Sequence, residues 1–588
     1  MSLKKTAILV FTVLAIFIQF RNVSGQAVPQ PVANQGIYDF LDEMAALHLT
    51  EINSAVKPWS RLFIAQCLEE IDGKRDRLNI RQQKELDFYM LDFGKEMQWH
   101  NGTMAQRRRG SKLMGKKLPS SEGPGVGWLK AQQSNGPMSA DEGQNTDGIT
   151  AMWFKGPGQG KRFDVFYYRD SLFSITVNPI FGGEMFHNAE GKATYWRNGI
   201  EARSYIGHWG FFASLRDNHE KPLLGLPQYL TPRTDGHIKN GNDWSEMQGG
   251  ITYSWRWGDA GLVKDNLEWG DNYDGANIFG GNNPTFVQLK LHLKPAKWFD
   301  FNYFHGWLNS MVVDSSKSYW VSNSYGTSYR EEYHSKFIAA NMFTFIPFRY
   351  LYLSAGNSII YDADNVNPAY LIPLFFYKSV DHTLSSGINN MNSQMFFNVS
   401  SRQVKHLHLY AAWFIDEMSV KRFTEKDQWN FFSYKAGFRL SDFPVQDLSF
   451  TTEFTYTYPL TFQHNVPTLT FENVDYNLGH YLKDNAREWY LAFDYHPVRT
   501  MDINIFFSDA IRGPDYTALG TDRLGNPPLA SVEWHNRSYG IKASYQVIND
   551  LYTWGSFIIS DISGNPTWTP GYFFGKRNTM NFGVTYGF

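Results

Sequence analysis

Three features that are scarce in this sequence each exclude a class of protein. Cys67 is the only cysteine among 588 residues, so the chain forms no internal disulfide and no cysteine-based metal cage. Beyond the N-terminal segment, no run approaches about 20 uninterrupted apolar residues, which excludes membrane-spanning helices. An excess of one charge is also missing, because the formal net charge is −2, and nucleic acid is therefore not an expected partner.

Aromatic residues, at 17%, and glycine, at 49 residues, are abundant instead. This composition fits many aromatic-rich strands joined by turns. Residues 578–588, NTMNFGVTYGF, alternate apolar side chains with small polar ones, so an extended strand has one face for lipid and one for water. A soluble β-sandwich can end on such a strand, but a terminal Phe588 is typical of the closing strand of a Gram-negative outer-membrane barrel. We therefore expect the barrel-insertion machinery to bind this end.

The N-terminal region predicts export followed by a small helical unit. Residues 1–25 combine two lysines, an apolar core and small residues at the end, which indicates a cleaved signal peptide. Residues 26–100 then show helical periodicity in three segments, with Ser60 and Asn79 as predicted N-caps of the second and third. A core of this size is marginal alone, so we expect the unit to pack inside the barrel lumen or under its periplasmic mouth. Residues 101–148 predict a basic, Gly/Ser-rich linker.

Residues 149–588 read as a succession of strands with alternating apolar and polar side chains. The clearest are residues 253–257, 287–294, 407–416, 447–458, 489–495 and 501–507. Short links alternate with long stretches, as periplasmic turns and external loops do in a transmembrane barrel. Counting back from the C-terminus places both chain ends in the periplasm and every long loop outside. The sequence therefore predicts a mainly β fold, a transmembrane antiparallel β-barrel of about 18 strands in the cell outer membrane, with membrane lipid as a partner.

Three stretches resemble the Wzi capsule-assembly family of outer-membrane proteins. They are NLEWGDNYDGANIFGGNNPTFVQL at 266–289, NPAYLIPLFFY at 367–377 together with LHLYAAWFIDE at 407–417, and NLGHYLKDNAREWYLAFD at 477–494. The layout of helices joined to a large barrel also resembles the family. The resemblance implies an 18-stranded barrel with a helical plug, which binds surface polysaccharide as a lectin and helps anchor or assemble the capsule.

A lectin needs aromatic platforms for sugar rings, with amides and carboxylates beside them for the hydroxyl groups. The glycan-binding candidates on predicted external loops are Trp269, Asp271, Asn272, Tyr273, Asp274, Trp244, Tyr319 and Trp320. Each loop has a structural interpretation as well, because aromatic residues at strand ends form the interfacial girdle and Asp-Asn pairs form turns.

Charged residues at predicted inward-facing positions indicate a lumenal charge network. Its members are Glu201, Arg203, Arg256, Lys264 and Glu268. Such a network binds a plug or sets pore selectivity. His406 and His408 have a spacing that suits a metal, but no third ligand is recognisable, so lumenal histidines are favoured and no metal or other cofactor is predicted.

Two other classes of function stay open at this point. An outer-membrane hydrolase is disfavoured, because the sequence contains neither a GxSxG elbow nor an HExxH motif, and we predict no enzymatic activity. A porin or substrate channel shares every barrel feature, as does a barrel subunit of an export or assembly complex. The position of the helical unit separates a plugged barrel from an open channel.

Overall fold

A computed structural model describes residues 27–97, 150–153, 164–170, 172–234, 241–324, 326–384, 391–425, 427–518 and 521–587. The predicted signal peptide, the basic linker 101–148 and the terminal Phe588 lie outside these residues. The assignments made for them therefore stay predictions.

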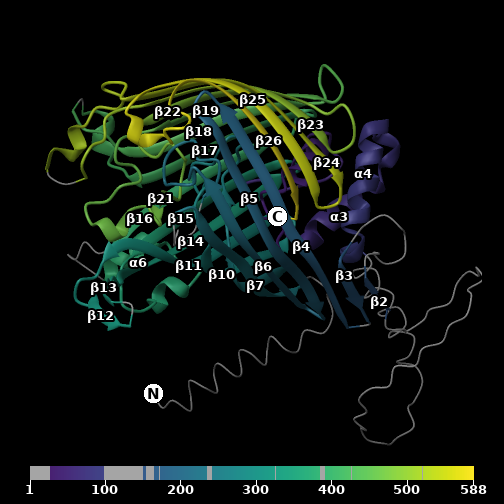
Figure 1. Ribbon diagram of the computed structural model, residues 1–588, viewed down its shortest axis with the longest axis horizontal. Coiled ribbons are helices and arrows are strands. Elements are labelled where there is room, and N and C mark those ends of the chain that lie inside the picture. Colours follow the sequence, from purple (N-terminus) through teal and green to yellow (C-terminus); the bar gives the residue numbers. More distant parts are fainter. Residues whose placement is uncertain are drawn as a thin grey trace, which may run out of the picture.

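The described residues contain a closed, antiparallel β-barrel of 18 strands, which confirms the predicted fold class (Figure 1). Its strands are β4 (Phe173–Asn188), β5 (Gly191–Ile206), β6 (Trp209–Lys221), β7 (Asp243–Trp255), β8 (Gly258–Asp265), β10 (Phe286–Ala296), β11 (Phe299–Val313), β14 (Tyr333–Phe348), β15 (Leu351–Tyr361), β16 (Met391–Ser401), β17 (Leu407–Glu417), β18 (Phe431–Ser441), β19 (Leu448–Thr457), β22 (Ala486–Tyr495), β23 (Met501–Arg512), β24 (Trp534–Ile548), β25 (Leu551–Gly564) and β26 (Gly575–Tyr586). The barrel closes between β26 and β4, where Met580 pairs with His187. The short strands β2 (Thr150–Trp153) and β3 (Phe166–Arg169) pair with each other, and β3 also pairs with the first part of β4.

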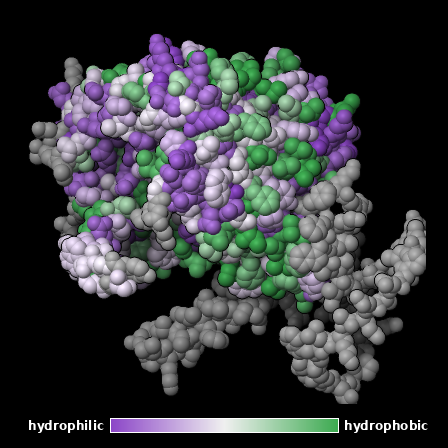
Figure 2. All heavy atoms as spheres, in the orientation of Figure 1, coloured by the Kyte–Doolittle hydropathy of each residue, from purple (hydrophilic) through white to green (hydrophobic). Residues whose placement is uncertain are grey.

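The closing strand β26 has the two faces that its sequence predicts. Met580 and Phe582 are 58% and 60% exposed on the outer side, whereas Thr579 and Thr585 are buried on the lumenal side. Apolar side chains gather in the same way over the outer wall near β4, β6 and β26 (Figure 2). Because a strand in lipid needs an apolar outer face, this alternation is what positions the barrel in a membrane.

The connections between barrel strands differ sharply between the two rims. At one rim, here the short-turn rim, each connection spans at most six residues, as at 349–350 and 402–406. All the long connections lie at the other rim, which we call the long-loop rim. This rim also has one two-residue turn, between β4 and β5. The predicted alternation of short and long links is therefore present with this single exception among the described strands.

The helical unit covers the short-turn rim, at the opposite end of the barrel from the hairpin of β12 (Tyr319–Asn323) and β13 (Gly326–Arg330) (Figure 1). Its helices are α2 (Gln35–Ala46), α3 (Arg61–Asp72) and α4 (Ile80–Asp92). Ser60 and Asn79 cap α3 and α4 as predicted, because their side chains accept the backbone N–H of Phe63 and of Gln82. Among the described residues, no helix is long and apolar enough to cross a membrane.

Several side chains fix the helical unit to the turns of the short-turn rim. His48 stacks on Tyr350 with ring centroids 4.2 Å apart. Arg81 Nε lies 2.8 Å from Asp447 Oδ1 in the turn between β18 and β19. These contacts hold the unit at the mouth of the barrel, while residues such as Asp42 and Lys57 also line the lumen, so the unit combines the two predicted positions.

Two long connections, residues 266–285 and 458–485, turn back into the lumen instead of extending from the rim. They carry the short strands β9 (Glu268–Trp269), β20 (Glu472–Asn473) and β21 (Tyr476–Asn477). Their apolar residues form a dry core with the inner faces of β10, β11 and β14–β17. Buried members of this core are Leu267, Trp269, Ile278, Phe279, Phe286, Phe304, Leu308, Ile338, Met342, Phe396, Phe414, Phe462, Leu469 and Phe471. One half of the lumen is thus filled by protein.

Candidate functional site

The lumenal connection 266–285 meets the helical unit inside the barrel. Its strand β9 pairs with β1 (Val56–Lys57), so that Trp269 lies opposite Val56 and Glu268 opposite Lys57. Lys57 Nζ and Glu268 Oε1 are 2.7 Å apart, and both side chains are mostly buried. This small sheet joins two segments that are separated by more than 200 residues in the chain.

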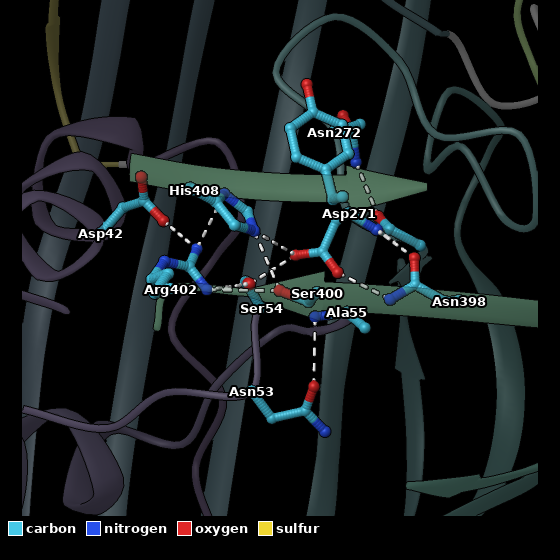
Figure 3. A network of polar contacts seen from close by, with 12 residues as sticks. Asp42, Asn53, Ser54, Ala55, Asp271, Asn272, Asn398, Ser400, Arg402 and His408 are labelled. Atoms are coloured by element: carbon cyan, nitrogen blue, oxygen red, sulfur yellow. Dashed lines mark hydrogen bonds and ion pairs between the residues drawn. The ribbon is translucent and has the colours of Figure 1, made fainter. Parts of the chain in front are cut away.

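A buried polar network extends this junction to the barrel wall at β16 and β17 (Figure 3). We call it the latch. Its members are Asp42, Ser54, Asp271, Tyr273, Asn398, Ser400, Arg402 and His408. They come from the helical unit, the lumenal connection, two wall strands and the turn between those strands.

Arg402 and Asp271 are the two centres of the latch. The Arg402 guanidinium forms an ion pair with Asp42 and donates to Ser54 Oγ at 3.0 Å. The Ser54 hydroxyl in turn donates to Asp271. Asn398 holds Asp271 twice, since its amide donates to the carboxylate at 2.7 Å and its carbonyl accepts the Asp271 backbone N–H at 3.1 Å.

Tyr273 and His408 complete the network on the cavity side. The Tyr273 hydroxyl donates to Asp42 Oδ2 at 2.6 Å and lies 2.8 Å from His408 Nδ1. The other ring nitrogen of His408 lies 2.9 Å from Ser400 Oγ. His408 is therefore a lumenal histidine, whereas His406 lies in the turn between β16 and β17.

Burial and charge act in opposite directions on the two latch carboxyl groups. Burial favours the neutral form of Asp42, but Arg402 together with the other nearby cationic groups and the Tyr273 hydrogen bond outweighs burial, so the pKa of Asp42 lies below its usual range. For Asp271 burial outweighs the attraction of Arg402, so the pKa of Asp271 is raised. Arg402 is 1% exposed, pairs directly with Asp42 and reaches Asp271 through Ser54, so this one side chain links the two carboxyl groups of the latch.

The other half of the lumen holds a cavity of about 1160 Å³. It extends from residues 227–234 of the β6–β7 connection to Gln35 and Gly36 of the helical unit. Its aromatic lining includes Tyr195, Trp244, Tyr273, Tyr490, Phe506, Tyr552 and Trp554. Its polar lining includes Asp39, Glu184, Arg197, Arg216, Asn218, Arg233, Glu246, Arg439, Asp494, Asn504, Lys542 and Asn581. We call this space the lumen cavity.

Glu184 of β4 organises one wall of the lumen cavity. Its carboxylate accepts the Asn581 amide at 2.7 Å and the Trp554 indole N–H at 3.1 Å, and it lies 2.5 Å from an Arg233 nitrogen. The Arg233 guanidinium stacks on the Tyr195 ring, 3.7 Å from its centroid. Aromatic faces, amides and charges therefore converge on one side of the cavity.

None of the residues around Glu184 was predicted from the sequence. Glu184, Trp554 and Asn581 lie on the lumenal faces of β4, β25 and β26, and the register of these strands brings them together. The sequence did contain one signal for them. They alternate along their strands with lipid-facing residues such as Met185, Ile559 and Phe582, which predicts that their own side chains face the lumen. Arg233 comes from a long connection, for which alternation predicts nothing.

The structure distributes the predicted glycan-binding residues over three environments. Trp244, Asp271, Asn272, Tyr273 and Asp274 line the lumen cavity, Trp269 is 3% exposed in the apolar core, and Tyr319 and Trp320 are exposed on β12. The prediction that the WGDNYD stretch is an external loop is wrong, because pairing of β9 with β1 draws it into the lumen. The glycan-binding role of these residues stays a prediction.

The predicted lumenal charge network does not form as one unit. Glu201 and Arg203 do face the lumen of β5, 3.2 Å apart. Glu268 pairs with Lys57 of the helical unit inside the lumen and does not lie on a strand of the barrel wall. Arg256 is exposed in the turn between β7 and β8, and Lys264 lies opposite Val287, which is exposed on the outer wall. Arg256 lies beyond the end of β7, whereas the error for Lys264 is one of register, since a shift of one residue reverses the face.

Comparisons with known proteins identify the fold. No protein-family model and no curated sequence matches the chain. The chain is similar to the solved structure of Wzi from Escherichia coli, described as an outer-membrane protein involved in group 1 capsule assembly and as a carbohydrate-binding β-barrel. The TM-score is 0.53 at 9% sequence identity, over 96% of this chain and 100% of that one.

Two further structures are more distant. Pseudomonas aeruginosa OpdK with vanillate gives a TM-score of 0.40 at 9% identity, over 70% of this chain and 98% of that one. Acinetobacter baumannii OccAB2 gives 0.39 at 10% identity, over 70% and 97% of the two chains. The likeness to Wzi establishes an outer-membrane β-barrel fold for this chain, in agreement with the predicted resemblance.

Proposed function

We propose that this outer-membrane barrel binds a surface polysaccharide and helps to anchor or assemble it at the cell surface. In this proposal the long-loop rim faces outward and the helical unit closes the periplasmic mouth, as the short turns and long loops of transmembrane barrels indicate. The glycan enters the lumen cavity from the long-loop side. The carbohydrate binding described for Wzi supports the same assignment.

The observation that carries the proposal is the composition of the lumen cavity wall around Glu184. Sugar rings combine apolar faces with hydroxyl groups, so their sites combine aromatic rings with amides and carboxylates. Tyr195 and Trp554 supply the rings, while Asn581 and Arg233 supply donors. A cavity of about 1160 Å³ is large enough for several sugar residues, since pockets for drug-sized ligands occupy about 300–1,000 Å³.

The first test replaces Trp554 with alanine. Loss of the ring and of its hydrogen bond to Glu184 is expected to weaken binding of purified capsular polysaccharide at least about tenfold, which corresponds to about 1.4 kcal/mol. Binding is measured by calorimetry on the detergent-solubilised barrel. Trp209→Ala is the matched control, because Trp209 is 46% exposed on the outer wall and should leave the affinity unchanged. Equal affinities for wild type and Trp554→Ala would place the glycan elsewhere.

A cellular test addresses the role of the protein. Deletion of the gene is expected to shift polysaccharide from the cell-retained to the shed fraction. Re-expression of wild type should restore retention, and re-expression of Trp554→Ala should not. Unchanged retention in the deletion strain contradicts an anchoring role.

A substrate channel is the second candidate function, because the polar lumen cavity reaches from a long-loop connection to the helical unit. For the lectin, single-channel recordings in planar bilayers are expected to give no steady conductance from wild type. A variant that lacks residues 27–97 should conduct, since the remaining cavity is lined by polar groups. A large steady conductance of the wild type, together with unchanged glycan retention, would favour the channel.

A further inference from the structure

The connection between β15 and β16 lies against the outer wall of the barrel. It contains the short helices η2 (Pro368–Leu371) and α6 (Tyr377–Leu384). We call residues 362–384 the wall strap. The wall beneath it is formed by β10, β11, β14 and β15, whose outward side chains form an apolar cluster with Tyr370 and Tyr377 of the strap.

Alternation along the strands fixes which face of the wall the strap covers. On β14, Phe345 is 45% exposed and points outward, so Asn341, four residues earlier, points outward as well. The same reasoning on β15 places Asn357 on the outer face, since it has the same parity as Leu353, which is 39% exposed. Two amide side chains thus occupy positions that face lipid elsewhere in the barrel.

The strap covers these two amide side chains and forms hydrogen bonds to them through its backbone. The Asn341 amide donates to Pro373 O at 2.8 Å and to Phe375 O at 2.9 Å. Asn357 donates to Asn341 at 2.7 Å and accepts the Tyr377 backbone N–H at 2.9 Å. Both asparagines are at most 6% exposed. The polar groups of the wall and the backbone of the strap therefore satisfy each other's hydrogen bonds, as polar groups in a hydrocarbon environment must.

The opposite side of the strap is apolar. Its exposed side chains are Leu371 (39%), Ile372 (42%), Leu374 (63%), Phe375 (38%) and Phe376 (44%). These residues form the bend of the strap, next to Asn357. Asn357 lies four residues below Tyr361, the end of β15 at the long-loop rim, which corresponds to about 13 Å along the strand.

Polarity changes with height along the strap. Asn367 at its upper end donates its backbone N–H to the Tyr361 hydroxyl at the rim. The apolar bend follows at 371–376, and α6 then carries Lys378, Asp381 and His382 on the limb that leads back towards β16. A segment that dips into a leaflet and returns requires this order, with apolar residues deepest and polar residues at the interface.

We infer that the wall strap is embedded in the outer membrane, with residues 371–376 inserted among lipid acyl chains on the long-loop side. The exposed apolar surface of the strap continues the lipid-facing wall, where Phe397 on β16 is 42% exposed. A second copy of the chain seated on the same surface is the competing occupant. Contact with a second copy would not require the apolar residues to lie deepest and the polar residues to lie nearer the long-loop rim. Insertion into lipid explains this order, so lipid is the favoured occupant.

Nitroxide labels on the strap test the inference in vesicles of dimyristoylphosphatidylcholine. In a Cys67→Ala background, labels are attached through Leu374→Cys or Phe376→Cys and their collision rates with oxygen and with a water-soluble nickel complex are measured. Phe397→Cys is the lipid-facing control, and Trp320→Cys on the exposed β12 is the aqueous control. Two strap positions are used so that one poorly folding variant does not decide the result.

The expected result is an oxygen-to-nickel ratio at both strap positions that matches Phe397→Cys and exceeds Trp320→Cys several-fold. Ratios equal to that of Trp320→Cys would place the strap in water and overturn the inference. Low accessibility to both reagents would also overturn it, because the strap would then be covered by protein, as a second copy would do. The outcome is independent of glycan binding, which uses the lumen.

Discussion

Replacement of Arg402 by methionine is expected to detach the helical unit from the barrel and to open the short-turn mouth. The latch contains two buried carboxyl groups, Asp42 and Asp271; Arg402 pairs directly with the first and reaches the second through Ser54. Methionine retains most of the volume but removes the cation that pairs directly with Asp42. Removing one partner of a buried ion pair typically costs about 3–5 kcal/mol.

Two measurements report the opening. The helical unit of Arg402→Met is expected to become sensitive to added protease while the barrel strands stay protected. Single-channel recordings should change from silent to conducting. Because Asp42 is one of the groups left unpaired, the double variant Arg402→Met/Asp42→Asn should recover part of the lost stability.

A neighbouring arginine supplies the control. Arg349 lies in the turn between β14 and β15 and pairs with Glu51 of the helical unit at 2.6 Å, but its side chain is 69% exposed. Solvent screens such a pair, so Arg349→Met should barely change protease resistance or conductance. Equal effects of the two substitutions would show that the latch is not what holds the unit.

The barrel itself could be predicted because its signal repeats along the chain. Each strand needs an apolar face towards lipid, so residues such as Met580 and Phe582 alternate with Thr579 and Asn581. The alternation of short and long connections follows from the same requirement. These are local patterns, and each of the many strands confirms the others.

The lumen could not be predicted in the same way, because it depends on contacts between distant segments. The WGDNYD stretch has the composition of an exposed loop, and only its pairing with Val56–Lys57 turns it inward. Arg402 lies in a short turn, where a basic residue carries no recognisable signal. The convergence on Glu184 of Arg233, Trp554 and Asn581 likewise depends on barrel closure and on the course of a long connection.

The same reasoning explains why the sequence did not place residues 371–376, part of the stretch 367–377 that resembles the Wzi family, on the outer wall. An apolar run within a long connection resembles a short strand or a buried helix. Its position on the outer wall becomes evident only from the register that directs Asn341 and Asn357 outward. Two polar residues on a lipid-facing surface are, in retrospect, the local sign that something covers the wall.

Removal of the wall strap is expected to destabilise the barrel through these two asparagines. Tyr361 and Met391 are directly paired at the rim, so residues 364–388 can be replaced by a tight turn without moving β15 or β16. The amide N–H groups of Asn341 and the amide oxygen of Asn357 would then face lipid without their strap partners, at about 1–3 kcal/mol for each group left unpaired. The temperature at which the folded, fast-migrating form unfolds on a gel should fall markedly.

A rescue variant and a second deletion separate this mechanism from a general effect of shortening the chain. Asn341→Leu/Asn357→Leu in the strap-deleted protein should restore much of the lost stability, because leucine suits an exposed lipid-facing wall. The same substitutions in the full-length protein should destabilise it, since they remove the donors to Pro373 and Phe375. Deletion of the exposed β12–β13 hairpin should leave the unfolding temperature unchanged. If leucines fail to rescue the strap-deleted barrel, the wall beneath the strap does not face lipid when uncovered, and the strap has a different role.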